Sequence, residues 1–151
     1  MDSPASCRLR RGRVSIPGQL YLLTTTVVGR EPVFSDFCLA RLMVEQLRYA
    51  ERTGMVQSLA WVVMPDHLHW LIALDRVSLS TLMRQVKCRS TCLINKASGR
   101  SGRLWQKGFH DRALRREEDV LNVARYIVAN PLRAGLVSSV REYPHWDAVW
   151  L

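Results

Sequence analysis

The chain has few of the features that mark membrane or secreted proteins. No apolar stretch in its 151 residues is long enough to cross a bilayer, and the longest is broken by Pro65-Asp66. The N-terminus lacks the apolar core of a signal peptide. Its four cysteines follow neither a disulfide framework nor a zinc-ribbon spacing, so we expect free, buried thiols (Cys7, Cys38, Cys88 and Cys92). The localisation that follows is cytoplasmic.

Acidic residues are also scarce. Thirteen Asp and Glu stand against 22 Lys and Arg, which gives a formal net charge of +9. Such an excess on a small chain is typical of nucleic-acid binding, although a generic basic surface or affinity for acidic lipid would also produce it. Internal repeats and low-complexity segments are absent, so residues 1–151 are interpreted as one domain.

Hydrophobic patterns predict the element order β-α-β-β-α-β-α. The expected strands cover about 19–28, 56–64, 67–74 and 103–114, and the expected helices about 36–53, 79–97 and 117–130. This order predicts an α+β fold: a ferredoxin-like split βαβ antiparallel sheet with helices on one face, plus an additional C-terminal helix. Ser35 is the expected N-cap of the first helix. Residues 1–18 are predicted to be a basic N-terminal arm, and residues 140–151 are predicted to be an ordered C-terminal tail.

Two histidines separated by one leucine carry the strongest chemical signal. His67 and His69 lie at the start of a predicted strand, where alternate residues share a face and their Cβ atoms lie roughly 7 Å apart. Two imidazoles at this spacing suit one divalent cation. Ordinary surface or hydrogen-bonded histidines are an equally good interpretation of the pair by itself.

A tyrosine and an asparagine follow on the last predicted helix. Tyr126 and Asn130 are four residues apart, so they would share a helical face. Tyr126 is also compatible with an amphipathic aromatic at the edge of the core. Asn130 precedes Pro131 and is compatible with a helix-ending cap.

Taken together, several motifs resemble the IS200-like single-tyrosine transposases of the HUH endonuclease group. The run MPDHLHWLI and the later run ARYIVANPLRAGLV are most similar to the REP-associated tyrosine transposases. Residues 21–30, Leu104-Trp105-Gln106, residues 108–111 and Tyr143-Pro144 extend the resemblance over most of the chain in the family's order.

The resemblance implies cleavage and joining of single-stranded or hairpin DNA, including REP-like palindromes. Tyr126 would be the nucleophile that forms a 5′-phosphotyrosine. His67 and His69, with Asn130 as a third ligand, would hold Mg²⁺ or Mn²⁺, and the histidines favour Mn²⁺. The wider family has glutamine at the position of Asn130. It commonly has asparagine at the position of Asp66, and we interpret Asp66 as a turn residue.

Basic residues are expected to hold the DNA. The protein itself is expected to be a monomer or a homodimer and to associate with the nucleoid when it binds DNA. The candidates are Arg8, Arg10, Arg11 and Arg13 in the arm, and Arg84, Lys87, Arg89, Arg100, Arg103 and Lys107 in a second track. Trp105 and Phe109 are candidates for stacking on bases, whereas Trp70 is expected in the core. His110 is a candidate for DNA contact, proton transfer or a structural hydrogen bond. Two alternatives stay open: a DNA-binding protein without cleavage activity, host-domesticated or inactive, and a metal hydrolase of a small substrate.

Overall fold

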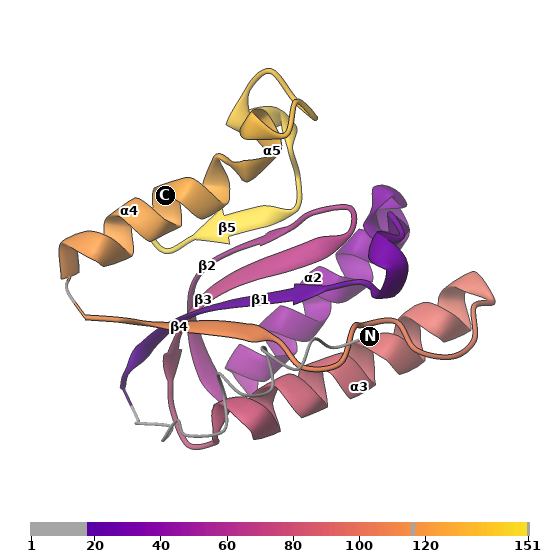
Figure 1. Ribbon diagram of the computed structural model, residues 1–151, viewed down its shortest axis with the longest axis horizontal. Coiled ribbons are helices and arrows are strands. Elements are labelled where there is room, and N and C mark those ends of the chain that lie inside the picture. Colours follow the sequence, from indigo (N-terminus) through magenta and orange to yellow (C-terminus); the bar gives the residue numbers. More distant parts are fainter. Residues whose placement is uncertain (1–17, 116, 151) are drawn as a thin grey trace.

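A five-stranded antiparallel sheet forms the centre of the structure (Figure 1). The computed structural model describes residues 18–115 and 117–150, with only the backbone at 117 and 118. The sheet order is β4-β1-β3-β2-β5, from β1 (Leu20–Thr26), β2 (Val56–Val63), β3 (His67–Leu74), β4 (His110–Leu114) and β5 (Trp146–Ala148). The first four strands, in the order β4-β1-β3-β2, have the ferredoxin-like topology that the sequence predicts.

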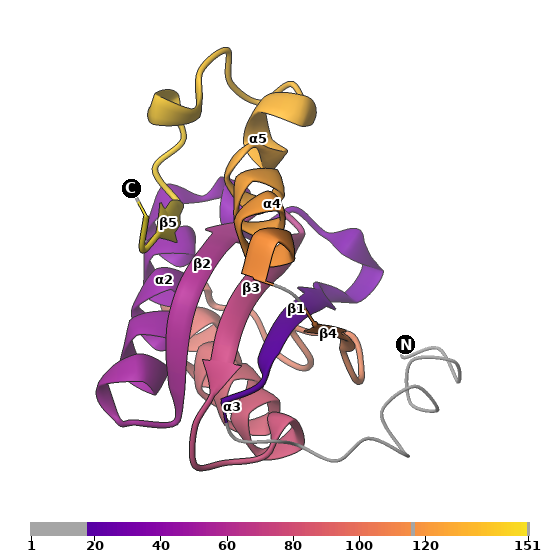
Figure 2. The ribbon, with the colours of Figure 1, turned by 90° about the vertical axis from the view of Figure 1, so that its left-hand side faces the viewer.

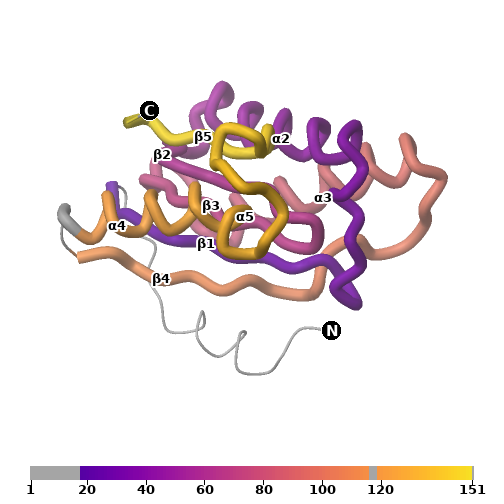
Figure 3. The backbone as a smooth tube through the Cα atoms, turned by 90° about the horizontal axis from the view of Figure 1, so that it is seen from above, coloured from indigo at the N-terminus to yellow at the C-terminus, as the bar shows by residue number. Residues whose placement is uncertain are grey.

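Helices lie on both faces of this sheet (Figures 2 and 3). One face carries α2 (Phe37–Arg52) and α3 (Leu79–Ser98), while α4 (Glu117–Val128) and the short α5 (Asn130–Arg133) lie on the other. Among the described residues, three 3₁₀ turns complete the elements: Val28–Arg30, Val33–Ser35 and Val140–Glu142.

Strand β3 belongs to two cores because its side chains alternate between the faces. Leu68, Trp70 and Ile72 are buried under α2 and α3, and the Trp70 Nε1 donates to Ser58 Oγ at 2.9 Å. Leu71 packs on the opposite face, in the cluster that includes residues of α4. Trp70 is therefore a core residue, as expected.

Local capping fixes the ends of α2 and α3. The Asp36 carboxylate accepts a hydrogen bond from the Leu39 N–H at 3.1 Å, so the prediction of Ser35 as the N-cap is wrong. Ser78 caps α3 by accepting from the Thr81 N–H. Gly99 ends α3 in the left-handed conformation, with φ at 72°, as its sequence position indicates.

The predicted strand over residues 103–114 is too long. Only His110–Leu114 pairs as β4, and Trp105 makes an isolated bridge with Val27. Gly102 and Gly108 have φ of +81° and +74°, outside the extended range, which explains why a regular strand does not continue through them. Trp105 and Phe109 are buried, so the interpretation that they stack on bases is wrong.

The C-terminal tail contributes a strand that the sequence pattern does not predict. Strand β5 pairs antiparallel with β2 at the edge of the sheet. The Tyr143 hydroxyl donates to the Val63 carbonyl oxygen at 2.5 Å, which ties the tail to the end of β2.

Three further predictions are settled or limited by the described residues. Cys38, Cys88 and Cys92 are free but exposed, not buried as expected. In the part of the chain that the structure describes, no helix has the length and apolar character to cross a bilayer. Cys7 and the arginines of the basic arm lie outside the described residues (Arg8, Arg10, Arg11 and Arg13).

Candidate active site

The two histidines lie at the beginning of β3, on the face that α4 covers. His67 is opposite Thr26 of β1, and His69 is opposite Thr24. The ring centroids of His67 and His69 are 4.9 Å apart, and both residues are half-buried. The structure therefore places the two imidazoles together on one face, as the alternation of a strand requires.

Backbone hydrogen bonds hold the turn before the histidines. The Met64 N–H donates to the His67 carbonyl oxygen at 2.8 Å and closes the hairpin between β2 and β3. The neighbouring loop is fixed as well, since the Val27 N–H donates to the Asp66 carbonyl and the Phe34 N–H donates to the Pro65 carbonyl. His67 therefore begins its strand from a well-anchored turn.

Each histidine has one ring nitrogen engaged by a neighbour. The Nδ1 of His67 lies 2.7 Å from the Asp66 Oδ1, and the Nδ1 of His69 lies 2.8 Å from the Thr24 Oγ1. Within the described residues, no hydrogen bond engages either Nε2. A ring held at one nitrogen by a carboxylate or hydroxyl, with the other nitrogen available, is the arrangement found around histidine metal ligands.

Asp66 has a larger role than the turn position assigned from the sequence. Its carboxylate also accepts from the Arg30 Nε at 3.0 Å. Burial acts to raise the pKa of Asp66, but the hydrogen bond from His67 and the charges of His67 and Arg30 outweigh burial and lower this pKa below its ordinary value. Asp66 is therefore an anionic partner that orients the His67 ring.

The electrostatics around His69 favour its neutral form. Burial lowers the pKa of His69 to about 4, and the charges of His67 and Arg133 act in the same direction. At neutral pH the imidazole is unprotonated, which is the form that donates a lone pair to a cation.

Tyr126 projects from α4 towards this histidine. Its ring centroid is 6.4 Å from that of His69, and 53% of the residue is exposed. The Arg133 guanidinium carbon lies 3.8 Å from the Tyr126 ring centroid, and the Arg133 Nη2 donates to the Tyr126 carbonyl oxygen at 2.6 Å. The phenol is thus accessible, and Arg133 covers its ring.

Asn130 does not continue the helix of Tyr126. Helix α4 ends at Val128, and Asn130 is the first residue of α5, with Pro131 in its first turn. Figures 1 and 2 show α5 over the end of the sheet where β3 begins. The Asn130 Nδ2 is buried without a hydrogen-bond partner in the described structure, and no described contact joins Asn130 to either histidine.

These residues fit a weakly held divalent cation better than a closed metal cage. The donors that the structure brings together are the two imidazole Nε2 atoms, while the Asn130 amide could ligate a cation only through its Oδ1. The described residues contain no group of three or more His, Cys, Asp or Glu side chains placed for a metal. A cation here would therefore keep coordination positions open for phosphate oxygens, as Mg²⁺ and Mn²⁺ sites in phosphoryl-transfer enzymes do.

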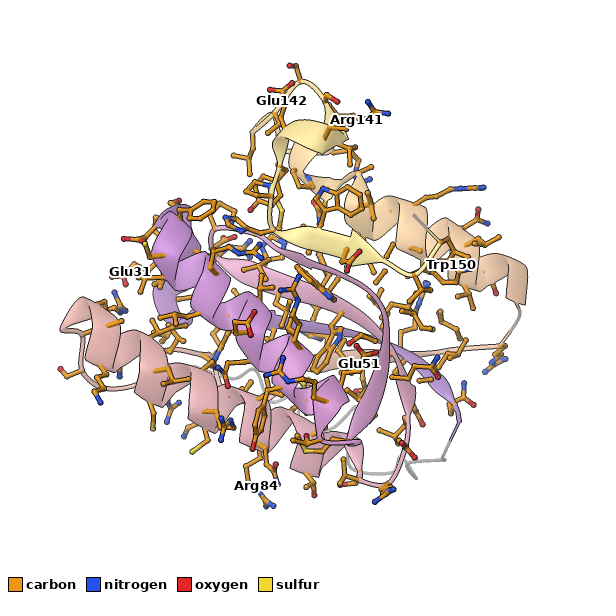
Figure 4. All side chains as sticks on the ribbon, turned by 180° about the vertical axis from the view of Figure 1, so that it is seen from behind. Glu31, Glu51, Arg84, Arg141, Glu142 and Trp150 are labelled. Carbon is orange, nitrogen blue, oxygen red and sulfur yellow. The ribbon has the colours of Figure 1, made fainter. Side chains whose placement is uncertain are left out.

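The second basic track divides into two parts. Arg84, Arg103 and Lys107 line a groove of about 620 Å³ between α3 and the loop before β4. Arg84 projects from α3 away from the sheet (Figure 4). Lys87 also lines this groove, but its ammonium donates to the carbonyl oxygens of Gln106 and Gly108.

The remaining polar candidates lie outside the groove. The Arg89 guanidinium stacks on Tyr49 at 3.8 Å and donates to Gln46, so it faces α2. Arg100 pairs with Glu31. His110 is exposed at the start of β4.

Sequence reasoning missed Arg133 and the orienting role of Asp66. Arg133 follows Tyr126 by seven residues, and this short separation in sequence is the local signal for their contact, although α4 ends at Val128 between them. The pairing of Thr24 with His69 has no such local signal, because the register between β1 and β3 fixes it.

The candidate site thus consists of a histidine pair on a central strand of a ferredoxin-like sheet, faced by an accessible tyrosine from an added helix. The family model described as "Transposase IS200 like" matches residues 18–130, and the chain belongs to this family. The resemblance drawn from the sequence motifs is thereby confirmed.

Individual relatives agree with this membership. The chain is 32% identical over 87 residues to a REP-associated tyrosine transposase of Escherichia coli K12, covering 56% of this chain and 50% of that protein. It is 27% identical over 101 residues to a putative REP-associated tyrosine transposase of Haemophilus influenzae, covering 59% and 57%. The chain thus spans only about half the length of the curated relatives it matches.

Solved structures agree at the level of the fold. A REP-associated tyrosine transposase bound to a REP hairpin superposes with a TM-score of 0.72 at 25% identity, over 89% of this chain and 79% of that one. A putative transposase from Deinococcus radiodurans superposes with a TM-score of 0.56 at 22% identity, over 78% and 94%, and supports the fold alone.

Proposed function

We propose that this protein is a metal-dependent endonuclease and strand transferase that cleaves single-stranded or hairpin DNA through a 5′-phosphotyrosine. The observation that carries the proposal is the position of the accessible Tyr126 ring, 6.4 Å from the ring of His69. Family membership and the similar transposase bound to a REP hairpin support DNA as the substrate and REP-like hairpins as candidates.

The chemistry follows from the residues that face one another. The Tyr126 hydroxyl oxygen attacks the scissile phosphorus and loses its proton, the bond from phosphorus to the 3′-oxygen breaks, and that oxygen takes up a proton. The phosphotyrosine retains a phosphodiester linkage, so a second 3′-hydroxyl can attack it and restore a DNA strand. This reversibility suits recombination.

His67 and His69, with Asn130, would hold Mg²⁺ or Mn²⁺. The bound cation would polarise a non-bridging oxygen of the scissile phosphate. Asp66 and Thr24 fix the two imidazoles through their Nδ1 atoms, and Arg133 lies over the Tyr126 ring. Arg84, Arg103 and Lys107 offer a groove for the phosphate backbone.

The test is capture of the covalent intermediate. A labelled hairpin oligonucleotide is incubated with the protein and Mn²⁺ or Mg²⁺, and adducts that survive denaturation are resolved on a gel. We expect an adduct with the wild-type chain and none with Tyr126→Phe or His67→Ala, while Tyr49→Phe, on a tyrosine outside the site, leaves the yield unchanged.

Two outcomes would contradict the proposal. Binding without an adduct, across DNA sequences and both metals, would indicate a DNA-binding protein that does not cleave. An undiminished adduct with Tyr126→Phe would place the nucleophile elsewhere. Mixing Tyr126→Phe with His67→Ala distinguishes catalysis within one chain from catalysis between chains, because only the latter restores the adduct.

A further inference from the structure

A hollow beside the candidate nucleophile is not used by the chemistry described above. It measures about 490 Å³ and shares Tyr126 and His69 with the active site. Its remaining walls come from β1, β4 and α4. The α4 residues in these walls precede Tyr126 in the chain, whereas Asn130 and Arg133 follow it. This volume falls within the range of about 300–1,000 Å³ typical of ligand pockets.

The walls combine apolar surfaces with polar groups. Leu22 and Val123 offer apolar side chains, and Arg112, Asp119 and Asn122 offer a guanidinium, a carboxylate and an amide. All three polar residues are exposed, and no hydrogen bond or ion pair from the described part of the chain engages them. Their donors and acceptors are therefore available to a ligand.

This set of groups fits a nucleobase better than a phosphate. Guanidinium, amide and carboxylate groups are the ones that pair with the edges of bases, and apolar side chains cover a base face. A pocket meant for phosphate alone would not include the Asp119 carboxylate, which repels an anion. The single exposed carboxylate thus indicates that an edge bearing hydrogen-bond donors enters the hollow.

The geometry of phosphoryl transfer identifies which nucleotide would enter. The attacking and leaving oxygens lie roughly in line through phosphorus. The nucleotide that leaves on its 3′-oxygen is therefore on the far side of phosphorus from Tyr126. The nucleotide that stays attached through its 5′-phosphate is bonded to phosphorus through an equatorial oxygen, and it becomes covalently linked to Tyr126, which itself lines the hollow.

We propose that this hollow is a nucleobase subsite for the nucleotide immediately 3′ of the cleaved bond. Arg112, Asp119 and Asn122 contact the edge of its base between Leu22 and Val123. Because the Asp119 carboxylate only accepts hydrogen bonds, a base with an exocyclic amino group binds better than thymine. The subsite rests on the proposed cleavage reaction and gives it a sequence preference at one position.

The experiment measures single-turnover rates of adduct formation with Mn²⁺ on hairpin oligonucleotides that differ at one position. The nucleotide 3′ of the cleaved bond is cytosine, thymine or an abasic residue. We expect the wild-type rate at subsaturating DNA to fall about tenfold from cytosine to the abasic residue, with thymine in between. Asp119→Asn should remove the difference between cytosine and thymine, and Asn122→Ala should weaken it.

Two controls separate the subsite from general effects. Arg125→Ala changes an exposed residue of α4 that lines a different hollow, so base dependence should persist. An abasic residue on the 5′ side of the cleaved bond should slow the wild type and Asp119→Asn by the same factor, because that nucleotide lies away from the hollow.

The outcomes for the subsite and for the reaction are distinct. Equal wild-type rates with cytosine, thymine and the abasic residue would refute the subsite while leaving the cleavage reaction intact. Loss of base dependence in Arg125→Ala as large as in Asp119→Asn would also refute it. No adduct with any DNA would refute the reaction itself. If a variant fails to fold, the comparison of the three substrates with the wild-type protein still tests whether the subsite exists.

Discussion

At the scale of single residues, the site depends on partners that hold each imidazole. Alternation along β3 predicts that His67 and His69 share a face, and the structure agrees. The groups that orient the rings come from outside the strand's own pattern, because Asp66 belongs to the turn and Thr24 to a neighbouring strand. Sequence alone could therefore predict the pair but not how its rings are held.

The contact between Asp66 and His67 gives the first prediction. Asp66→Ala should weaken Mn²⁺ activation of adduct formation about 10–100-fold, since groups that orient a histidine ligand have effects of this size. The readout is the Mn²⁺ concentration that gives half-maximal rate, with the wild-type rate regained at high Mn²⁺. Asp75→Ala changes an exposed aspartate after β3 and is the matched control. An unchanged Mn²⁺ dependence in Asp66→Ala would show that the contact does not serve the metal.

At the scale of elements, periodicity predicted most of the sheet but misjudged its ends. Strands β1 to β3 carry the alternation or buried run that identifies a strand. Strand β5 has only three residues, too few for any period, and its pairing with β2 depends on the tertiary fold. The loop before β4 misled the prediction because aromatic residues suit either a core or a stack of bases, and burial alone decides between them.

The loop gives the second prediction. Trp105 is 3% exposed, and its Nε1 donates to the buried Ser90 Oγ at 2.9 Å. Trp105→Ala should lower the free energy of unfolding by about 3–5 kcal/mol, because it opens a cavity and leaves Ser90 without this donor. Urea denaturation measures the loss, and Trp150→Ala, at an exposed residue labelled in Figure 4, should cost far less. A Trp105→Ala variant that unfolds at nearly the wild-type urea concentration would contradict this packing role.

The C-terminal tail gives a pH-dependent prediction. Burial raises the pKa of Tyr143 to about 12, above its ordinary value of 10.0. The folded chain therefore holds this proton more tightly than the unfolded chain does. The stabilisation is complete below pH 10 and is lost as the pH rises from 10 towards 12. Urea denaturation between pH 8 and about 11 should show a steeper loss for the wild type than for Tyr143→Phe; parallel curves would contradict this.

At the scale of the whole molecule, net charge alone does not say where DNA binds. The formal charge of +9 predicts nucleic acid as a partner, but several basic side chains are engaged within the chain. Lys87 holds the loop before β4, and Arg89 stacks on Tyr49. The net charge includes these engaged residues as well as the ones that could bind DNA. In the structure, Arg84, Arg103 and Lys107 line one groove.

Salt dependence tests whether this groove, and not total charge, holds the phosphate backbone. Each phosphate contact with single-stranded DNA contributes about 0.7 to the slope of log Kd against log salt concentration. The triple variant Arg84→Gln, Arg103→Gln and Lys107→Gln should therefore bind more weakly and lower this slope by about 2. Its rate of adduct formation at saturating DNA should stay close to that of the wild type, because none of the three residues faces Tyr126.

A charge-matched variant makes this prediction decisive. Arg48→Gln, Arg52→Gln and Arg141→Gln remove the same charge from exposed residues outside the groove. If the groove binds the DNA backbone, this variant should keep nearly the wild-type slope of log Kd against log salt concentration, because counterion release depends on local phosphate contacts. Equal losses of slope in both triple variants would mean that diffuse charge holds the DNA. The groove would then be an ordinary basic surface, and the DNA path would have to be sought elsewhere on the chain.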